Sequence, residues 1–276
     1  MDQNWQNFLH NLGVWEGSFT SISADGQELE STPSILELEG FDNNQRVSFR
    51  LRRFPSHGYN GSPISEINQD YHTLGRQIIF FNTGAFSKGT MQFAPFSEFG
   101  AEYGFVAGNR RLRLVQLYNR EGGLSSQVLI REFRQHSNAL ERPPLQIEQL
   151  IGEWYGTAHT CYASWEPSIH FTTHLRISQE KGYLFQHSNF LDQIHRSTAE
   201  INGNQIRFQS AEGDRCLFLL ADGTSSFIPL HLPRHHPFEV EVGWLLGDNE
   251  RQRLIRRYNP KGEWVSATHI VENKVI

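Results

Sequence analysis

Hydrophobic and polar residues alternate along much of the chain, and the alternation is clearest around Phe171. Phe171, Thr173, Leu175 and Ile177 fall on one side of an extended chain, and His170, Thr172, His174 and Arg176 fall on the other. A period of two residues predicts a β-strand with one buried face. Similar patterns predict strands at 34–38, 47–54, 76–81, 205–209 and 215–220.

Turn-forming residues separate these segments at short spacing, as at Asp25-Gly26, Asn60-Gly61 and Asn202-Gly203. Short strands joined by tight turns predict an antiparallel meander. Apolar residues recur at helical spacings of three and four in 4–12 and 145–151, so each of these segments predicts a short helix.

The two predicted helices precede the same motif, Gly13-x-Trp15-x-Gly17 and Gly152-x-Trp154-x-Gly156, at an offset of 139 residues. That offset, raised to 140 after Asp248, makes 14 of the 34 positions from 99 to 132 identical in the second half. About two identities are expected by chance at ordinary residue frequencies. The chain is therefore predicted to contain a duplication.

The middle of each half pairs less well and needs gaps, as when Gln77-Ile78 is aligned with Gln205-Ile206. The seam falls in the polar, proline-bearing stretch 138–144, which suits a linker. We predict a first domain at 1–140 and a second at 145–276. An antiparallel meander removes its exposed edges by closing into a barrel, so each domain is predicted to be an all-β barrel of about eight strands.

The composition restricts the partners that the protein can bind and the compartment in which it is expected. Aromatic residues make up 12% of the chain, as in β-rich domains, and the formal net charge of −5 gives no field that attracts nucleic acid or an anionic membrane. A small cluster, Arg50, Arg52 and Arg53, is most simply a solvated strand edge. No stretch approaches the roughly 20 apolar residues of a membrane span, and no signal peptide is recognised, so a cytoplasmic location is expected.

The residues resemble the lipocalin and wider calycin barrels, in which a short helix precedes Gly-x-Trp on the first strand and a late strand carries Arg. In those barrels the Arg packs over the Trp and closes one end. The resemblance assigns this role to Trp15 with Arg113 and to Trp154 with Arg253, or alternatively to Arg111 and Arg251. A guanidinium stacked on an indole gains about 0.5–2 kcal/mol.

The whole chain, with both motifs doubled, resembles a cyanobacterial family of tandem lipocalin-like (calycin) domains of unknown function. That family is distantly similar to the lyases that attach bilins to phycobiliproteins. The resemblance implies two tandem antiparallel lipocalin-like barrels, each preceded by a short helix.

Histidine is concentrated in the second half, and His159, His170, His174 and His187 are candidate ligand-binding residues. Residues four apart on a strand lie about 13 Å apart, so His170 and His174 cannot chelate one ion together. The alternative is that these histidines face solvent, since they lie opposite the apolar residues of their strand. Three further histidines at 231, 235 and 236 are read as an exposed loop, and with only two cysteines we predict no metal site.

The sequence carries no nucleophile elbow, phosphate-binding loop or zinc-protease helix, so a non-catalytic protein is favoured. The leading hypothesis is a binding protein that holds a small hydrophobic or tetrapyrrole-type ligand in one or both barrels. The alternatives are a bilin lyase or chaperone acting on a phycobiliprotein, and a structural module with solid barrels. The cofactor, the ligand and any protein partner stay open.

Overall fold

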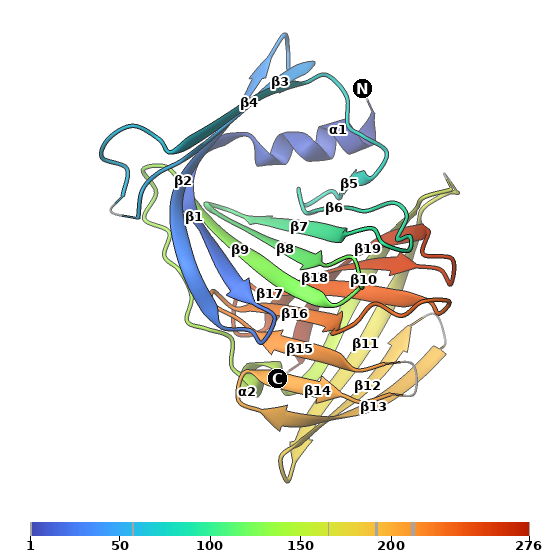
Figure 1. Ribbon diagram of the computed structural model, residues 1–276. Helices are drawn as coiled ribbons and strands as arrows, with labels where there is room; N and C mark the ends of the chain where they lie inside the picture. The colour runs from blue at the N-terminus through green and yellow to red at the C-terminus, as the bar shows by residue number, and fades with distance from the viewer. Residues whose placement is uncertain (1, 57, 165, 191–192, 211–212, 276) are drawn as a thin grey trace. The chain divides into compact units, whose positions relative to one another are not determined.

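A computed structural model describes residues 2–56, 58–164, 166–190, 193–210 and 213–275, and it confirms the all-β fold (Figure 1). The first half contains α1 (Gln3–Phe8), the 3-10 helix η1 (Leu9–Asn11), β1 (Gly13–Ser23), β2 (Glu28–Phe41), β3 (Arg46–Arg53), β4 (Ser65–Tyr71), β5 (Ile78–Phe80), β6 (Phe86–Gly89), β7 (Phe99–Ala107), β8 (Arg110–Tyr118) and β9 (Leu124–Arg134). The second half contains α2 (Ile147–Leu150), β10 (Gly152–Tyr162), β11 (Ile169–Glu180), β12 (Tyr183–Phe190), β13 (Gln193–Asn202), β14 (Gln205–Phe208), β15 (Arg215–Leu219), β16 (Thr224–Pro229), β17 (Phe238–Leu245), β18 (Glu250–Tyr258) and β19 (Trp264–Val275).

The chain divides into two compact units. The first consists of Met1–Gly89, Glu102–Gln116 and Ser126–Glu141, and the second consists of Thr90–Ala101, Leu117–Ser125 and Arg142–Ile276. The second unit thus includes two short segments from the first half of the sequence. The boundaries expected from the sequence, 1–140 and 145–276, stay a prediction.

Strands β10 to β19 form a closed antiparallel barrel, here called the second barrel, in which β19 pairs with β10. It has ten strands, two more than the eight expected from the sequence. Trp154, Leu175 and Ile177 face its interior, where they pack against side chains from α2 and from β12 to β17. Apolar side chains therefore fill the end of the barrel nearest to α2.

The first nine strands form one curled sheet, here called the first sheet, in the order β4-β3-β2-β1-β9-β8-β7-β6-β5 (Figure 1). Its end strands are β4 and β5, which do not pair with each other among the described residues. Both halves therefore repeat the same antiparallel meander, but strand pairing closes only the second.

Strand β14 has no counterpart in the first sheet. Gly104 and Gly243 lie 139 residues apart, and the space beside each is taken by a side chain from the neighbouring strand, Phe86 and Ser225, also 139 apart. The same offset pairs Gly84 with Gly223, both with positive φ, and so aligns β5 with β15. The sequence alignment of Gln77-Ile78 with Gln205-Ile206 is therefore wrong, because Gln205 begins the additional strand.

In the first sheet α1 occupies the edge that β14 covers in the second barrel. The side chain of Asn4 donates to the carbonyl of Ile78 at 2.9 Å and accepts from the amide of Phe80 at 2.6 Å. At the equivalent position of β15, the amide of Leu219 donates to the main-chain carbonyl of Asn204 at 2.8 Å. A side chain of the helix thus replaces one backbone contact of the missing strand.

Candidate functional site

A buried cluster of charges lies on the inner face of the first sheet. Arg111 and Arg113 both bind the carboxylate of Glu132, with Nη2 of Arg113 at 2.8 Å, and Nη1 of Arg113 reaches Glu102 at 3.0 Å. Burial alone would raise the pKa of Glu132, but the two guanidinium groups hold it below its usual range. Burial likewise opposes the charge of Arg113, whose pKa is nevertheless raised by Glu132 and Glu102.

The second barrel repeats the cluster with the residues that the 140 offset predicts. Arg251 and Arg253 bind Glu272, with Nη2 of Arg253 at 3.2 Å, and Nη1 of Arg253 reaches Glu241 at 3.1 Å. The pKa of Glu272 is lowered in the same way, since both arginines outweigh the effect of burial. In each copy the carboxylates are therefore bound by residues of the same cluster, which favours a structural role for it.

The two motif tryptophans are fully buried, and each donates its indole N–H to a carbonyl of the segment that precedes β1 or β10. Trp15 donates to Asn11 at 2.9 Å and Trp154 donates to Leu150 at 2.8 Å. The cations on their rings differ between the copies. Arg134 lies 4.4 Å from the ring centre of Trp15, whereas Arg251 and Lys274 lie 4.6 and 5.2 Å from that of Trp154.

The arginines favoured by the sequence lie over other rings. Arg113 lies 5.3 Å from the centre of Phe19, and Arg253 lies 5.8 Å from that of Phe190. The alternative residue Arg251 makes the contact with Trp154, while Arg111 lies nearest to Phe86, at 5.9 Å. A comparison of identities missed Arg134 and Lys274, which occupy matched positions but differ in type.

The four candidate histidines face away from the barrel interior. His170 and His174 alternate with the core residue Leu175 on β11, and His159 pairs directly with His170 across β10 and β11. His187 alternates with the buried Leu184 on β12 and lies opposite Arg176 and Arg196 on the adjacent strands. Their role as ligand-binding residues stays a prediction, and this placement moves any such site to the outer face.

The histidines contact one another and their neighbours in pairs. The rings of His159 and His170 stack at 4.0 Å, and those of Tyr155 and His174 stack at 4.4 Å. Nε2 of His174 also lies 3.3 Å from Glu153. Burial, and then His170, lower the pKa of His159. Among the residues that the structure describes, no three His, Cys, Asp or Glu side chains are grouped to hold a metal ion.

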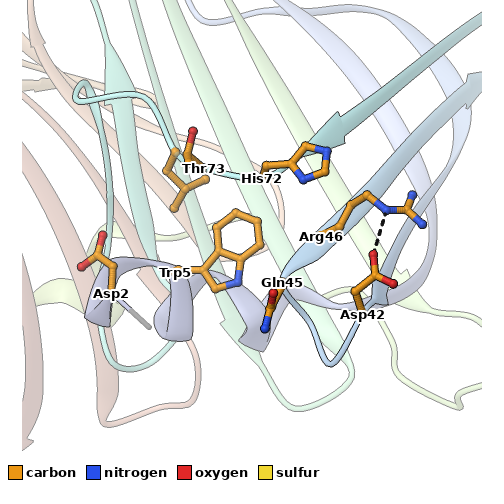
Figure 2. Close-up of a pocket in the computed structure, with 8 residues that line it drawn as sticks. Asp2, Trp5, Asp42, Gln45, Arg46, His72 and Thr73 are labelled. Atoms are coloured by element: carbon orange, nitrogen blue, oxygen red, sulfur yellow. Dashed lines mark hydrogen bonds and ion pairs between the residues drawn. The ribbon is translucent and has the colours of Figure 1, made fainter.

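A pocket of about 610 Å³ lies beside α1 in the first unit, and we call it the α1 pocket. Its wall comes from α1, from the β2–β3 turn and from the segment after β4, through Asp2, Trp5, Asp42, Gln45, Arg46, His72, Thr73 and Leu74. In Figure 2 the Trp5 indole lies in the middle of the view, with Arg46 and His72 on one side and Asp2 on the other.

Contacts within the first unit fix much of this wall. The Trp5 indole donates to the carbonyl of Asn44 at 2.7 Å, and Arg46 binds Asp42 and Asp70 at 3.4 and 3.2 Å. The sequence did not predict the α1 pocket, because its residues come from three separate segments without a shared motif. A second pocket of about 460 Å³ in the same unit includes Glu16, Pro33, Tyr59 and Phe133.

None of the helices in the described parts of the chain is long and apolar enough to cross a membrane. The curated proteins contain no match to the chain. Residues 1–137 match the N-terminal domain of DUF3598, a domain of unknown function. Residues 141–275 match the C-terminal domain of a protein described as biogenesis factor required for ATP synthase 1.

Among solved structures, a DUF3598 protein of unknown function from Nostoc punctiforme is 43% identical with a TM-score of 0.92, and the match covers 100% of both chains. The S-type phycobiliprotein lyase CPES from Guillardia theta is 10% identical over 47% of this chain and 90% of its own, with a TM-score of 0.38. A putative outer membrane protein from Bacteroides fragilis is 10% identical over 99% of this chain and 100% of its own, with a TM-score of 0.26.

The two low TM-scores carry no argument about function. The full-length match to the Nostoc protein does show the family, and it agrees with the cyanobacterial resemblance drawn from the doubled motifs. This chain belongs to the DUF3598 family.

Proposed function

We propose that this protein is a non-catalytic, cytoplasmic binding protein for a small molecule, and that the ligand occupies the α1 pocket. The carrying observation is that pocket, an open hollow of about 610 Å³, a volume within the range of small-molecule sites. The α2 end of the second barrel offers no comparable support, since buried apolar side chains fill it.

The lining of the α1 pocket indicates the kind of ligand. Trp5 and Leu74 supply apolar surface, whereas Arg46, His72 and Gln45 supply polar groups that can fix a ligand's orientation. A ring system with polar substituents meets both requirements. This description includes the tetrapyrroles and other largely hydrophobic ligands expected from the sequence.

A ligand screen tests the proposal directly. The full chain is mixed with haem, biliverdin, β-carotene or palmitate, and binding is followed by absorbance and by thermal shift. Thr73 lines the pocket and is exposed, so Thr73→Arg should fill the pocket and weaken binding at least about tenfold without unfolding the chain. Thr172→Arg on the exposed face of β11 is the matched control. Failure of every ligand to bind, or equal binding by both variants, would reject the proposal.

The match of residues 141–275 to a biogenesis factor supports a second candidate function, a role in assembling a protein complex. A barrel with a packed apolar core suits such a role, because protein recognition needs surface rather than a cavity. Mixing the purified chain with the purified catalytic portion of an ATP synthase tests this function. A complex that co-elutes in gel filtration and gives a binding isotherm supports it, and the absence of both rejects it.

The bilin lyase predicted as an alternative has a separate test. Co-expression of the chain with a bilin and a phycobiliprotein subunit should give a subunit whose colour survives denaturation, since a lyase leaves a covalent bond. A colourless subunit rejects this alternative and leaves the binding proposal intact.

A further inference from the structure

Arg53, the last residue of β3, faces the interior of the first sheet. It lies directly opposite Ser34 of β2, and it alternates with Leu51, which packs in the core beside Leu36. Its neighbours Arg50 and Arg52 lie on the outer face, where they bind Glu66 and Glu37 at 2.9 Å. The three arginines that form one cluster in the sequence are therefore divided between two faces.

No carboxylate binds Arg53 among the described residues, although the side chain is partly buried. Its Nε and the hydroxyl of the opposite Ser34 are both shielded from solvent and lack a hydrogen-bond partner. Its guanidinium lies 4.3 Å from the ring centre of Phe19, which Arg113 also approaches, at 5.3 Å. Burial, and then the charge of Arg113, lower the pKa of Arg53. Polar groups left without partners in this way are costly.

In the second barrel an apolar side chain occupies the position of Arg53. Phe190 takes the place of Arg53, since it lies opposite Thr173 as Arg53 lies opposite Ser34. Phe171 likewise takes the place of Thr32, and the two phenylalanines contact each other at 6.0 Å. The first sheet thus has a cation and a hydroxyl where the second barrel has an apolar contact.

Cations outnumber carboxylates on the inner face of both copies. The second barrel sets Arg251 and Arg253 against Glu241 and Glu272, and it adds Lys274 over Trp154 and Arg215 over Phe227. The first sheet sets Arg111, Arg113 and Lys88 against Glu102 and Glu132, and it adds Arg134 over Trp15 and Arg53 over Phe19. Lys88 binds Glu102 and Arg134 donates to the carbonyl of Leu12, whereas the Nε of Arg53 has no partner in the described parts of the chain, so Arg53 is the cation of this face that is open to an anionic ligand.

The geometry points to a carboxylate-binding site on the inner face of the first sheet, in which Arg53 binds the carboxylate of a small ligand and Ser34 and Thr32 supply hydroxyl donors. This site is separate from the α1 pocket, which lies beside α1 and the β2–β3 turn. It therefore does not depend on the function proposed above.

The site offers contacts to both the carboxylate and the hydrocarbon part of such a ligand. A guanidinium matches a carboxylate through two parallel hydrogen bonds, and a carboxylate would satisfy the polar groups that lack partners. Ile67 of β4 lies opposite Leu51 on the same face and is 49% exposed, so together with Phe19 it offers apolar surface to the ligand's hydrocarbon part. The expected class is a monocarboxylate with a short apolar chain or ring.

Octanoate and octanol form a suitable pair of probes, because they share a chain and differ in the charged group. Calorimetric titration of the full chain should show that octanoate binds at least about tenfold more tightly than octanol, as expected for a charge-assisted contact. Nitrogen-15 NMR of the arginine side chains should show that octanoate shifts the Nε–H signal that disappears in Arg53→Lys.

Three variants complete the test. Arg53→Gln and Arg53→Phe should each lower octanoate affinity at least about tenfold and leave octanol binding unchanged, and Arg53→Phe also repeats the residue of the second barrel. Arg52→Gln, on the outer face beside Glu37, should change neither affinity. Equal binding of the two probes, a shift confined to other arginines, or full affinity in Arg53→Gln would overturn the site, whatever is found for the α1 pocket.

Discussion

The first sheet and the second barrel share one sequence pattern but solve the problem of their edge strands differently. The second barrel has a tenth strand, β14, which pairs with β13 and β15 and leaves no free edge. The first sheet has no such strand, and α1 binds the edge of β5 through asparagine side chains. A duplicated meander can therefore keep its core while one copy exchanges a strand for a helix, and the exchange leaves a pocket beside that helix.

Removing the central carboxylate of each charge cluster should have the largest effect. Glu132→Gln and Glu272→Gln each leave buried guanidinium groups underpaired, so each should lower the free energy of unfolding by about 3–5 kcal/mol. The loss should be smaller in the first sheet, where Glu102 is 21% exposed, than in the second barrel, where Glu241 is 13% exposed. Urea denaturation followed by tryptophan fluorescence measures both.

Glu66→Gln is the matched control, since Glu66 binds Arg50 on the surface and should cause no measurable change. A greater loss for Glu132→Gln than for Glu272→Gln would contradict the view that the second barrel shields its cluster more completely.

Asn4→Ala tests whether α1 acts as a substitute strand. The change removes two hydrogen bonds and leaves the amide of Phe80 and the carbonyl of Ile78 without these partners, so we expect a loss of about 2–3 kcal/mol. Amide hydrogen exchange should show faster exchange at Phe80 in particular. Asn204→Ala in the second barrel should leave the exchange of the Leu219 amide unchanged, because Asn204 binds Leu219 through its main-chain carbonyl. Faster exchange at Leu219 in Asn204→Ala, or unchanged exchange at Phe80 in Asn4→Ala, would contradict the comparison.

The repeat and its core positions could be predicted from the sequence. The features that distinguish the two copies depend on contacts between distant residues. The doubled Gly-x-Trp-x-Gly and the shared Arg-x-Arg positions predicted the repeat, because identical residues occupy identical core positions. The pairing of Asn4 with Ile78 joins residues 74 apart and leaves no local pattern. The partner of Trp15 was missed because Arg134 and Lys274 are conservative replacements rather than identities.

A period of two residues predicts which side chains of a strand share a face, but not which distant residues that face contacts. Alternation correctly placed Leu175 and Ile177 opposite His170 and His174. The same alternation, through Val47 and Leu51, places Arg53 on the apolar face, so the expectation that the whole arginine cluster forms a solvated edge is wrong for this residue. The contact of Arg53 with the ring of Phe19 joins distant parts of the sequence and leaves no local pattern.

Lowering the pH should destabilise the second barrel through a histidine that the first sheet lacks. The loss should be smaller than those predicted above. His269 on β19 is 3% exposed and binds Gln252 at 2.8 Å, whereas the matched residues of the first sheet are the buried Leu129 and Leu112. Burial, and then His159, lower the pKa of His269 to about 3. Below about pH 6.5 the imidazole of His269 is therefore protonated in the unfolded chain but stays neutral in the folded chain. Stability due to this group is complete above pH 6.5 and is lost on acidification towards pH 3, by up to about 1.4 kcal/mol per pH unit.

The double variant His269→Leu, Gln252→Leu should reproduce the arrangement of the first sheet and reduce this slope. Urea midpoints between pH 7 and pH 5 measure it, in a range above the pH at which the depressed pKa values of Glu132 and Glu272 matter. The double variant should keep part of this dependence of stability on pH, because the pKa of His159 is also lowered. Adding His159→Gln to the double variant should remove the remaining part. An unchanged slope in the double variant would show that His269 is protonated in the folded barrel, and the difference between the copies would then be one of packing alone.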